Sequence, residues 1–218
     1  MIVLLTWTYR SPKGTETIFR SEEMSAEQAV LIAEDLAKTG RVKQVNFIDR
    51  FESSWTLKEL KGYLKGIETE PHNIIVYFDG GFDWETKAAG VGCVIYYDQN
   101  GKSYRLRKNA SITGLTSNNE AEYAALHLCL LELELLGVHH LPVRIIGDSR
   151  VVINHLTEEW LVIEQDLYSW AEKIEEKMDA LGLQPEYELV SRKKNSEADR
   201  LAAQALAGTE IMATIEKS

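Results

Sequence analysis

Residues 74–81 read Ile-Ile-Val-Tyr-Phe-Asp-Gly-Gly, and they place one carboxylate directly after five apolar side chains. A continuous apolar run of this length is typical of a strand buried on both faces. An unpaired carboxylate beside such a strand is unfavourable, so Asp79 must be hydrogen-bonded, ion-paired or metal-bound. Asp-Gly-Gly alone is also typical of a polar residue that opens a turn, and the surrounding sequence has to distinguish the two interpretations.

The segments after Gly81 alternate between strand and helix patterns. Apolar stretches at 89–97 and 103–107, joined by the turn Asp98-Gln99-Asn100-Gly101, predict two strands that form a meander with 74–78. The elements expected next are a largely apolar helix at 118–136, a strand at 142–146, helices at 149–157 and 164–181, a strand at 187–190 and a helix at 196–207. The order is βββαβαβα, and we assign it to one domain at residues 73–210.

The start of the chain predicts a separate small α/β domain at residues 1–68. Alternating residues at 2–9, followed by a Pro-Gly turn and the stretch 17–19, predict a hairpin. A strand at 42–48 separates two helices, each with the spacing of a capping box at its start: Ser25 with Gln28, and Thr56 with Glu59. The pattern is ββαβα, and the polar segment 68–72, which contains a proline, is the expected linker.

Composition predicts a globular protein of the cytoplasm. Hydrophobic residues are 44% of the 218, and no apolar run approaches the roughly 18 residues of a membrane span, so no membrane partner is expected. The opening MIVLLTW lacks the basic flank and cleavage site of a signal peptide. Cys93 and Cys129 lie in apolar runs without CxxC spacing, so we expect buried free thiols; the five histidines likewise form no zinc-ligand pattern.

The net charge of −10 is unfavourable for a nucleic-acid enzyme, because Lys and Arg neutralise phosphates in such complexes. Residues 1–72 hold 10 basic and 11 acidic side chains, whereas the rest of the chain holds 14 and 23. The acidic excess therefore lies in the larger predicted domain, where it indicates either a solvated surface or a metal site.

Two glutamates compete for a functional role in the segment Ser117-Asn118-Asn119-Glu120-Ala121-Glu122. Ser117 and Glu120 have the spacing of a reciprocal capping box, so Glu120 already has a structural task. Glu122 is two residues further on, over half a turn round the helix, and it has no such task. Glu122 is therefore the candidate functional acid, with a solvated helix position as the alternative.

Two more acids lie where a strand ends or a helix begins. Asp148 follows the strand at 142–146 and could be an N-cap, a task that Ser149 could also fill. Asp199 lies in the first turn of the last helix, where it could interact with the helix dipole. Each of these positions can converge with Asp79 and Glu122 on one sheet edge. Grouped carboxylates repel one another unless cations compensate, so hard divalent ions are their natural occupants.

Four segments occur in the order and approximate spacing of the ribonuclease H family: YFDGG at 77–81, SNNEAEY at 117–123, GDSRVVI at 147–153 and NSEADRLA at 195–202. Over about two thirds of its length the chain resembles the type 1 bacterial and archaeal members that have a short final loop. The resemblance implies a mixed five-stranded sheet flanked by helices, with the first strand between the strands that end at Asp148 and Ser191. It further implies that the family's metal-binding, catalytic acids fall on Asp79, Glu122, Asp148 and Asp199.

The activity implied by the resemblance is that of an endonuclease that hydrolyses the RNA strand of an RNA–DNA hybrid, with two Mg²⁺ or Mn²⁺ ions. Two ions about 4 Å apart can generate a hydroxide and stabilise the departing oxygen, and Asp79 would bridge them. Products would be a 5′-phosphate and a 3′-hydroxyl. The implied substrate contacts are Gly80, Gly81, Ser117, Asn118 and Asn119.

Two departures from the family pattern leave a second function open. The loop Ser191-Arg192-Lys193-Lys194-Asn195 stands where many members have a histidine, and Arg192 is either a substitute phosphate contact or a surface charge. Residues 158–186 are acidic, whereas some members have a basic helical handle there. The alternative is a catalytically weak or inactive module of the same fold that binds nucleic acid or protein. The intact set of four acids favours the enzyme, because an unused carboxylate cluster is electrostatically unfavourable.

The remaining candidate contacts with substrate lie outside the four motifs. One is a basic strand formed by Lys102, Arg105, Arg107 and Lys108. Another is the domain at residues 1–68, which resembles no family that we recognise and whose aromatics Trp7, Tyr9 and Trp55 are more typical of a core than of base stacking. This domain is expected to grip the substrate, to contact a protein partner or to stabilise its neighbour.

Overall fold

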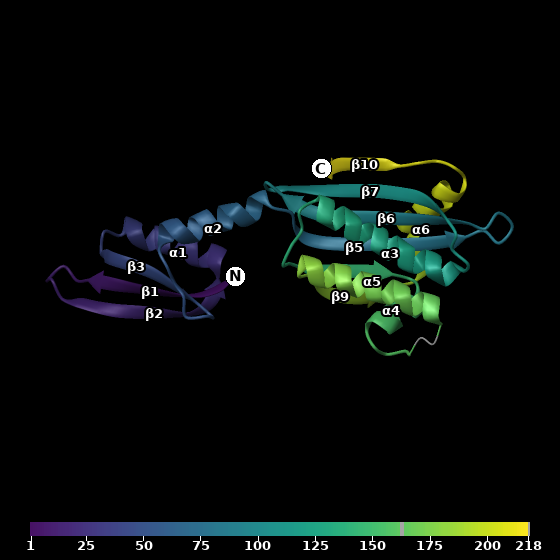
Figure 1. The fold of residues 1–218 in the computed structure, drawn as a ribbon. Helices are drawn as coiled ribbons and strands as arrows, with labels where there is room; N and C mark the ends of the chain where they lie inside the picture. The colour runs from purple at the N-terminus through teal and green to yellow at the C-terminus, as the bar shows by residue number, and fades with distance from the viewer. Residues whose placement is uncertain (162–163, 218) are drawn as a thin grey trace. The chain divides into compact units, whose positions relative to one another are not determined.

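The computed structural model describes residues 1–161 and 164–217, and the side chain of Ile67 lies outside the described part. The chain forms two compact units, Met1–Thr69 and Glu70–Ser218, whose elements are labelled in Figure 1. No described helix is both long and apolar enough to cross a membrane.

The first unit is a four-stranded antiparallel sheet in the order β2-β1-β3-β4 with two helices. Its elements are β1 (Ile2–Arg10), β2 (Glu16–Ser25), α1 (Ala26–Lys38), β3 (Val42–Asp49), β4 (Ser54–Trp55) and α2 (Leu57–Thr69). Figure 1 shows α1 and α2 together on one side of the sheet. The core between them contains Val3, Leu5, Ala29, Phe47 and Leu60, all buried. Strand β4 was missed by the sequence pattern because it has only two residues.

Both predicted helix starts of this unit are confirmed. The backbone N–H of Gln28 donates to Oγ of Ser25 at 3.3 Å. In the second box the exchange is reciprocal, since the N–H of Thr56 donates to Oε2 of Glu59 at 2.8 Å and the N–H of Glu59 donates to Oγ1 of Thr56 at 3.3 Å. These bonds satisfy amide groups that the first helical turn leaves free.

The second unit contains one six-stranded mixed sheet in the order β10-β7-β6-β5-β8-β9. Its strands are β5 (His72–Phe82), β6 (Ala88–Gln99), β7 (Lys102–Thr113), β8 (Pro142–Gly147), β9 (Gln184–Leu189) and β10 (Met212–Lys217). Its α-helices are α3 (Asn118–Leu135), α4 (Arg150–Leu156), α5 (Gln165–Leu181) and α6 (Ser196–Leu206). Only Glu70 and Pro71 separate α2 from β5, so the connection is shorter than the predicted linker at 68–72.

Two expectations about this sheet are wrong. The sheet has six strands rather than five, because β10 pairs antiparallel with β7, from Met212 opposite Lys108 to Lys217 opposite Ser103. Most of β10 is exposed, so its side chains lack the apolar pattern that identified the other strands. Strand β5 does not lie between β8 and β9 but between β6, with which it is antiparallel, and β8, with which it is parallel.

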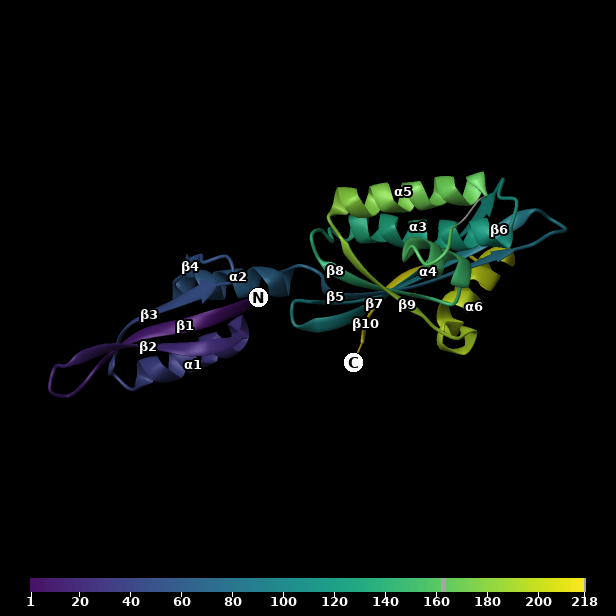
Figure 2. The same ribbon diagram turned by 90° about the horizontal axis from the view of Figure 1, so that it is seen from below.

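Helices cover both faces of the sheet, as Figure 2 shows: α3 and α5 lie on one face and α6 on the other. The larger core lies under α3 and α5 and contains Ile74, Val76 and Phe78 of β5 with both cysteines, which are buried free thiols. A smaller cluster formed by Val94, Ala198 and Leu201 packs α6 against the opposite face. Strand β5 is therefore an inner strand that is fully buried on the α3 side and partly buried at Ile75 and Tyr77 on the other, and its carboxyl end lies between the starts of α3 and α6.

Candidate active site

Asp79 is a strand residue and not the start of a turn. Strand β5 continues through Gly80 and Gly81 to Phe82, and Asp79 pairs with Gly92 of β6 in the antiparallel ladder. The turn interpretation of Asp-Gly-Gly is therefore wrong. Asp79 is 7% exposed, so the structure has placed a carboxyl group where its charged form is poorly solvated.

The two glutamates of α3 divide as the spacing predicts. Glu122 accepts a hydrogen bond from the backbone N–H of Gly80 at 3.1 Å, which ties α3 to the end of β5. Glu120 has its N–H bonded to Oγ of Ser117 at 3.2 Å, as a helix cap requires. Its side chain, however, accepts from the N–H and the hydroxyl of Thr116, both at 2.6 Å, instead of returning to Ser117. The box thus closes one residue earlier than predicted.

Gly80 is required by the packing of strand against helix. A Cβ atom at this position would lie 2.2 Å from the backbone carbon of Ala121 and 2.3 Å from the nitrogen of Glu122. The space that a side chain would need is filled by α3 itself. Packing against α3 is therefore sufficient to require this glycine, and Gly80 also contributes to the pocket described below.

Asp148 is free of the capping task because Ser149 performs it. Oγ of Ser149 accepts from the N–H of Val152 at 3.4 Å at the start of α4. Oδ1 of Asp148 instead accepts from Nδ2 of Asn195 at 2.7 Å. The same Nδ2 donates to the backbone oxygen of Phe78 at 2.8 Å. Asn195, the residue before α6, thus connects the end of β5 to the end of β8.

Asn195 is the site residue that sequence reasoning missed. It is 1% exposed, and its Oδ1 is buried without a hydrogen-bond partner among the described residues. The sequence contains one signal, an asparagine directly before a helix, but that signal indicates a cap. Nothing local to the sequence indicates that its amide would reach two different strands.

Asp199 lies in the first turn of α6 and is held by Arg192. Nε of Arg192 donates to Oδ1 of Asp199 at 2.9 Å, and Nη2 of the same guanidinium donates to that oxygen as well. The Arg192 side chain is 78% exposed, which leaves it free to move if another cation takes its place. The helix-dipole interpretation of Asp199 is compatible with this position, but the ion pair is the dominant contact.

All four predicted acids line one pocket of about 200 Å³. The residues around them are Gly80, Gly81, Asn118, Arg192, Ala202, Ala203 and Leu206. Of the other predicted substrate contacts, Ser117 and Asn119 are not among the described residues that line this pocket. Oδ1 of Asn118 accepts from the N–H of Phe82 at 3.2 Å, so the amide nitrogen of Asn118 remains available to a substrate.

The electrostatics of the pocket oppose full ionisation of its acids. Burial, followed by the charges of Asp148 and Asp199, raises the pKa of Asp79 to about 8, although Arg192 opposes the shift. Burial, followed by the charges of Asp79 and Asp148, raises the pKa of Glu122 to about 9. A cation bound among these groups would remove the repulsion and favour their charged forms.

The donor chemistry of the pocket fits divalent ions, although the side chains are not yet arranged around one. Carboxylate oxygens are the ligands that Mg²⁺ and Mn²⁺ prefer, and repelling carboxyl groups with raised pKa values are a usual property of ion-free sites. Among the described residues, however, no group of three or more His, Cys, Asp or Glu side chains is placed to hold an ion as it stands. The pairing of Asp199 with Arg192 accounts for part of this, because it commits one acid to an internal cation.

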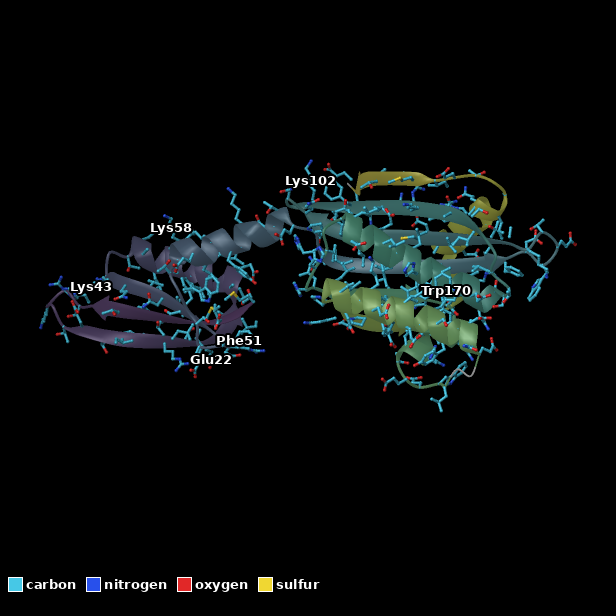
Figure 3. The ribbon with its side chains drawn as sticks, viewed as in Figure 1. Glu22, Lys43, Phe51, Lys58, Lys102 and Trp170 are labelled. Atoms are coloured by element: carbon cyan, nitrogen blue, oxygen red, sulfur yellow. The ribbon has the colours of Figure 1, made fainter. Side chains whose placement is uncertain are left out.

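The predicted basic strand is largely neutralised and does not reach the pocket. Figure 3 labels Lys102 at the end of β7 opposite the hairpin that follows Phe82, and its Nζ donates to Glu216 at 2.8 Å. Arg105 pairs with Glu197 at 3.1 Å, and Lys108 pairs with Glu132 at 2.5 Å. These side chains therefore supply little free positive charge to a substrate at Asp79.

Comparison with known proteins identifies the fold and the family. A model of the family described as Reverse transcriptase-like matches residues 77–205, a range that includes all four acids. The ribonuclease H1 of the halophilic archaeon Halobacterium salinarum NRC-1 is 26% identical, with a TM-score of 0.53 over 62% of this chain and 98% of its own. LC11-RNase H1, solved in complex with an RNA/DNA hybrid, is 30% identical, with a TM-score of 0.54 over 62% and 98%. The chain belongs to the ribonuclease H family.

A relative of similar length extends the likeness to the first unit. The uncharacterized protein YpeP of Bacillus subtilis (strain 168) is 42% identical over 193 residues, which are 88% of this chain and 85% of that protein. This share is larger than Glu70–Ser218 alone can supply, so the alignment reaches into Met1–Thr69. At least part of the first unit is therefore shared with this relative.

Proposed function

We propose that this protein is a metal-dependent endonuclease that hydrolyses the RNA strand of RNA–DNA hybrids. The observation that carries the proposal is the convergence of Asp79, Glu122, Asp148 and Asp199, from four separate segments of the chain, on one pocket at the carboxyl end of β5. Ribonuclease H relatives of the same fold support nuclease activity on hybrids, and one of them was solved with an RNA/DNA hybrid.

The four acids would hold two Mg²⁺ or Mn²⁺ ions, which supply an activated water and stabilise the departing oxygen during in-line displacement at phosphorus. The protein's own contribution is to fix the carboxylates beforehand. Gly80 holds Glu122 through its N–H, and Asn195 holds Asp148 through Nδ2. Such supporting hydrogen bonds orient ligand groups and restrict their rotation.

Arg192 has two roles in this proposal. Without ions, its guanidinium compensates Asp199 and lowers the repulsion among the acids. With ions and substrate present, the exposed side chain is free to turn to a phosphate oxygen, for which a planar guanidinium is well suited. The amide nitrogen of Asn118 and the backbone at Gly81 would contact the nucleic acid beside the cleaved bond.

Two observations favour a second function, a ribonuclease H module with weak or no catalysis. The ion pair between Arg192 and Asp199 and the lack of a preformed three-ligand group among the described residues are what an inactive site would also show. In that case the pocket would bind nucleic acid or a protein without cleaving it.

Cleavage of a hybrid labelled at the 5′ end of its RNA, with Mg²⁺ or Mn²⁺, distinguishes the two functions. Duplex DNA and duplex RNA of the same sequence are the substrate controls. We expect RNA fragments with 3′-hydroxyl ends from the hybrid only, and no cleavage by the Asp79→Asn variant. Binding of the hybrid without cleavage at any ion concentration would support the inactive module and contradict the nuclease.

A further inference from the structure

The hairpin between β5 and β6 presents an exposed tryptophan beside the candidate active site. Its loop comprises residues 83–87, and Figure 1 shows this connection extending beyond the edge of the sheet. Trp84 is 62% exposed, which is high for a large aromatic side chain. Phe82, whose ring lies 4.9 Å from that of Trp84 in an edge-to-face arrangement, supports it from the strand.

The loop is held in place by hydrogen bonds of its own. The N–H of Asp83 donates to the oxygen of Ala88 and the N–H of Lys87 donates to the oxygen of Asp83, both at 2.9 Å. Oδ1 of Asp83 accepts from the N–H groups of Glu85 at 2.8 Å and Thr86 at 3.3 Å. The Asp83 carboxylate is therefore used within the loop, and Trp84 is presented on a pre-organised support, which lowers the entropy lost on binding.

Lys87 adds a positive charge to the same surface. Its Nζ lies 5.0 Å from the centre of the Trp84 ring and 5.9 Å from that of Phe82. Its backbone has φ +57°, a left-handed conformation in which glycine or asparagine is normally favoured. Lysine is thus present at a position where its backbone is disfavoured, and the contacts of its side chain within the loop are those with the Trp84 and Phe82 rings.

The hairpin follows the pocket directly along the chain. Gly80 and Gly81 line the pocket, and the next residue along the strand, Phe82, is tied by its N–H to Asn118, another lining residue. At about 3.3 Å per strand residue, Trp84 lies within roughly 17 Å of Asp79 along the chain. A nucleic-acid strand advances about 3.4 Å per nucleotide along a helix axis, so a strand cleaved at the pocket can reach the hairpin within about five nucleotides.

We propose that Trp84 and Lys87 form a second contact with the nucleic-acid strand that passes through the pocket. Trp84 stacks on a base or ribose, and Lys87 contacts a neighbouring phosphate. Stacking on an aromatic face tolerates any base, and one lysine at a phosphate adds a salt-dependent contribution to affinity. The inference rests on the proposed function, because it takes a hybrid as the ligand. Lys87 would thereby provide one basic contact that the paired basic strand does not provide, in a loop that also carries Asp83 and Glu85.

The test measures binding of a fluorescent RNA–DNA hybrid to the full-length Asp79→Asn protein, in which cleavage does not interfere. Trp84→Ala should lower the affinity about tenfold, and Trp84→Phe should lower it less, since an aromatic face remains. Lys87→Gly should lower the affinity several-fold and reduce the salt slope by about 1. Lys102→Gln is the matched control, because it removes one positive charge at the end of β7 opposite the hairpin. It should change neither the affinity nor the salt slope.

Thermal stability separates binding from structure for Lys87. Because its φ favours glycine, Lys87→Gly should leave the melting temperature unchanged or raise it while affinity falls. A lower melting temperature together with the lower affinity would overturn the phosphate contact and make Lys87 a structural residue.

Hybrid length provides the second readout. The duplex is shortened from one end, so that fewer than about five base pairs remain beyond the bond at the pocket. For one of the two ends, the Asp79→Asn parent protein should lose affinity on this shortening. The same protein with Trp84→Ala should show no such loss. Equal affinity, salt slope and length dependence in the parent, Trp84→Ala and Lys87→Gly proteins would overturn the hairpin contact and leave the nuclease proposal intact. A parent protein that binds no hybrid at all would overturn both.

Discussion

Nδ2 of Asn195 donates a hydrogen bond of 2.7 Å to Oδ1 of Asp148 across 47 residues of sequence. The same nitrogen also satisfies the backbone oxygen of Phe78, one residue before Asp79. One buried amide thus fixes the relative positions of two candidate ligands that lie on neighbouring strands. The precision of the acid cluster depends on this side chain as much as on the acids themselves.

Asn195→Ala should therefore destabilise the protein as well as lower its activity. The substitution leaves a buried carbonyl and a carboxylate without their donor, which costs about 1–3 kcal/mol in free energy of unfolding. We expect cleavage of the hybrid to fall about 10-fold to 100-fold, as for other groups that orient metal ligands. Urea unfolding and cleavage assays measure both effects, with Gln44→Ala on the exposed edge of β3 as the control. An unchanged free energy of unfolding would contradict the role given to Asn195.

The stability of the ion-free protein should decrease as pH rises through the neutral range. The pKa of Asp79 is about 8 in the folded protein, above its ordinary value near 4, so the folded state binds this proton more tightly than the unfolded state. The stabilising contribution is fully present below about pH 4 and is lost progressively as pH rises to about 8. Glu122, with a pKa of about 9, acts in the same direction.

Asp79→Asn should remove the Asp79 part of this dependence. We expect the variant to be more stable than the wild type by on the order of 1–3 kcal/mol at pH 8 in EDTA, and close to it at pH 5. Urea unfolding at both pH values measures the difference. A stability gap that does not widen with pH would show that the Asp79 carboxyl is not strained by burial and by its neighbours.

Local sequence signals predicted the elements well and the contacts between them less well. The apolar run before Asp79 and the capping spacings at Ser25 and Thr56 are short-range signals, and the structure confirms each of the elements that they predicted. The choice between Asp148 and Ser149 as helix cap depends on which side chain turns toward the helix, which sequence spacing leaves open. Which strands lie on either side of β5 likewise depends on tertiary packing, and local sequence patterns do not determine it.

One strand and one packing contact were missed for definite physical reasons. Strand β10 is an exposed edge strand, held by main-chain pairing with β7 rather than by burial, so no hydrophobic period marks it. Gly80 was predicted only as a substrate contact, and its close packing against the backbone of Ala121, which excludes a side chain there, was not predicted. Close approach of two backbones is a tertiary property, and a glycine in the sequence only permits it.

The glutamates of α3 provide a matched pair for testing the site. Glu122→Gln should lower cleavage by at least about 100-fold and weaken the melting-temperature increase caused by Mg²⁺ or Mn²⁺, because a ligand is lost. Glu120→Gln should lower stability by about 1 kcal/mol, because its carboxylate bonds to Thr116 and not to the pocket, and should leave the metal-induced increase intact. Equal metal responses in the two variants would contradict the assignment of Glu122.

Arg192→Ala should change metal binding and catalysis in opposite directions. Removing the guanidinium frees Asp199 from an internal competitor, so the Mn²⁺ concentration for half-maximal binding should fall by about threefold to tenfold. Cleavage at saturating Mn²⁺ should nevertheless fall about tenfold, because a phosphate contact is lost. Isothermal titration and cleavage assays measure the two effects. Arg192→Lys keeps a positive charge beside Asp199, so Mn²⁺ affinity should return part of the way to the wild-type value while cleavage stays low. Weaker Mn²⁺ binding by Arg192→Ala would refute the competition between Arg192 and Mn²⁺ for Asp199.

Removal of Met1–Thr69 should leave a folded nuclease that binds hybrid more weakly. The motivation is electrostatic, since residues 73–218 hold 14 basic and 23 acidic side chains and the basic strand is largely paired with acids. The two units have separate cores, so loss of the first need not unfold the second. Titration of labelled hybrid at several salt concentrations should show about tenfold weaker binding and a smaller salt slope, because phosphate contacts are lost.

The rival explanation is that the first unit covers apolar surface or binds a protein partner. Loss of cover would produce aggregation of Glu70–Ser218, visible by light scattering, rather than weaker binding by a monodisperse protein. A soluble Glu70–Ser218 protein with unchanged affinity and unchanged salt slope would refute the substrate grip and leave the partner-binding role. Because the salt slope counts the phosphates that the protein neutralises, it identifies lost contacts even if the truncated protein is also less stable.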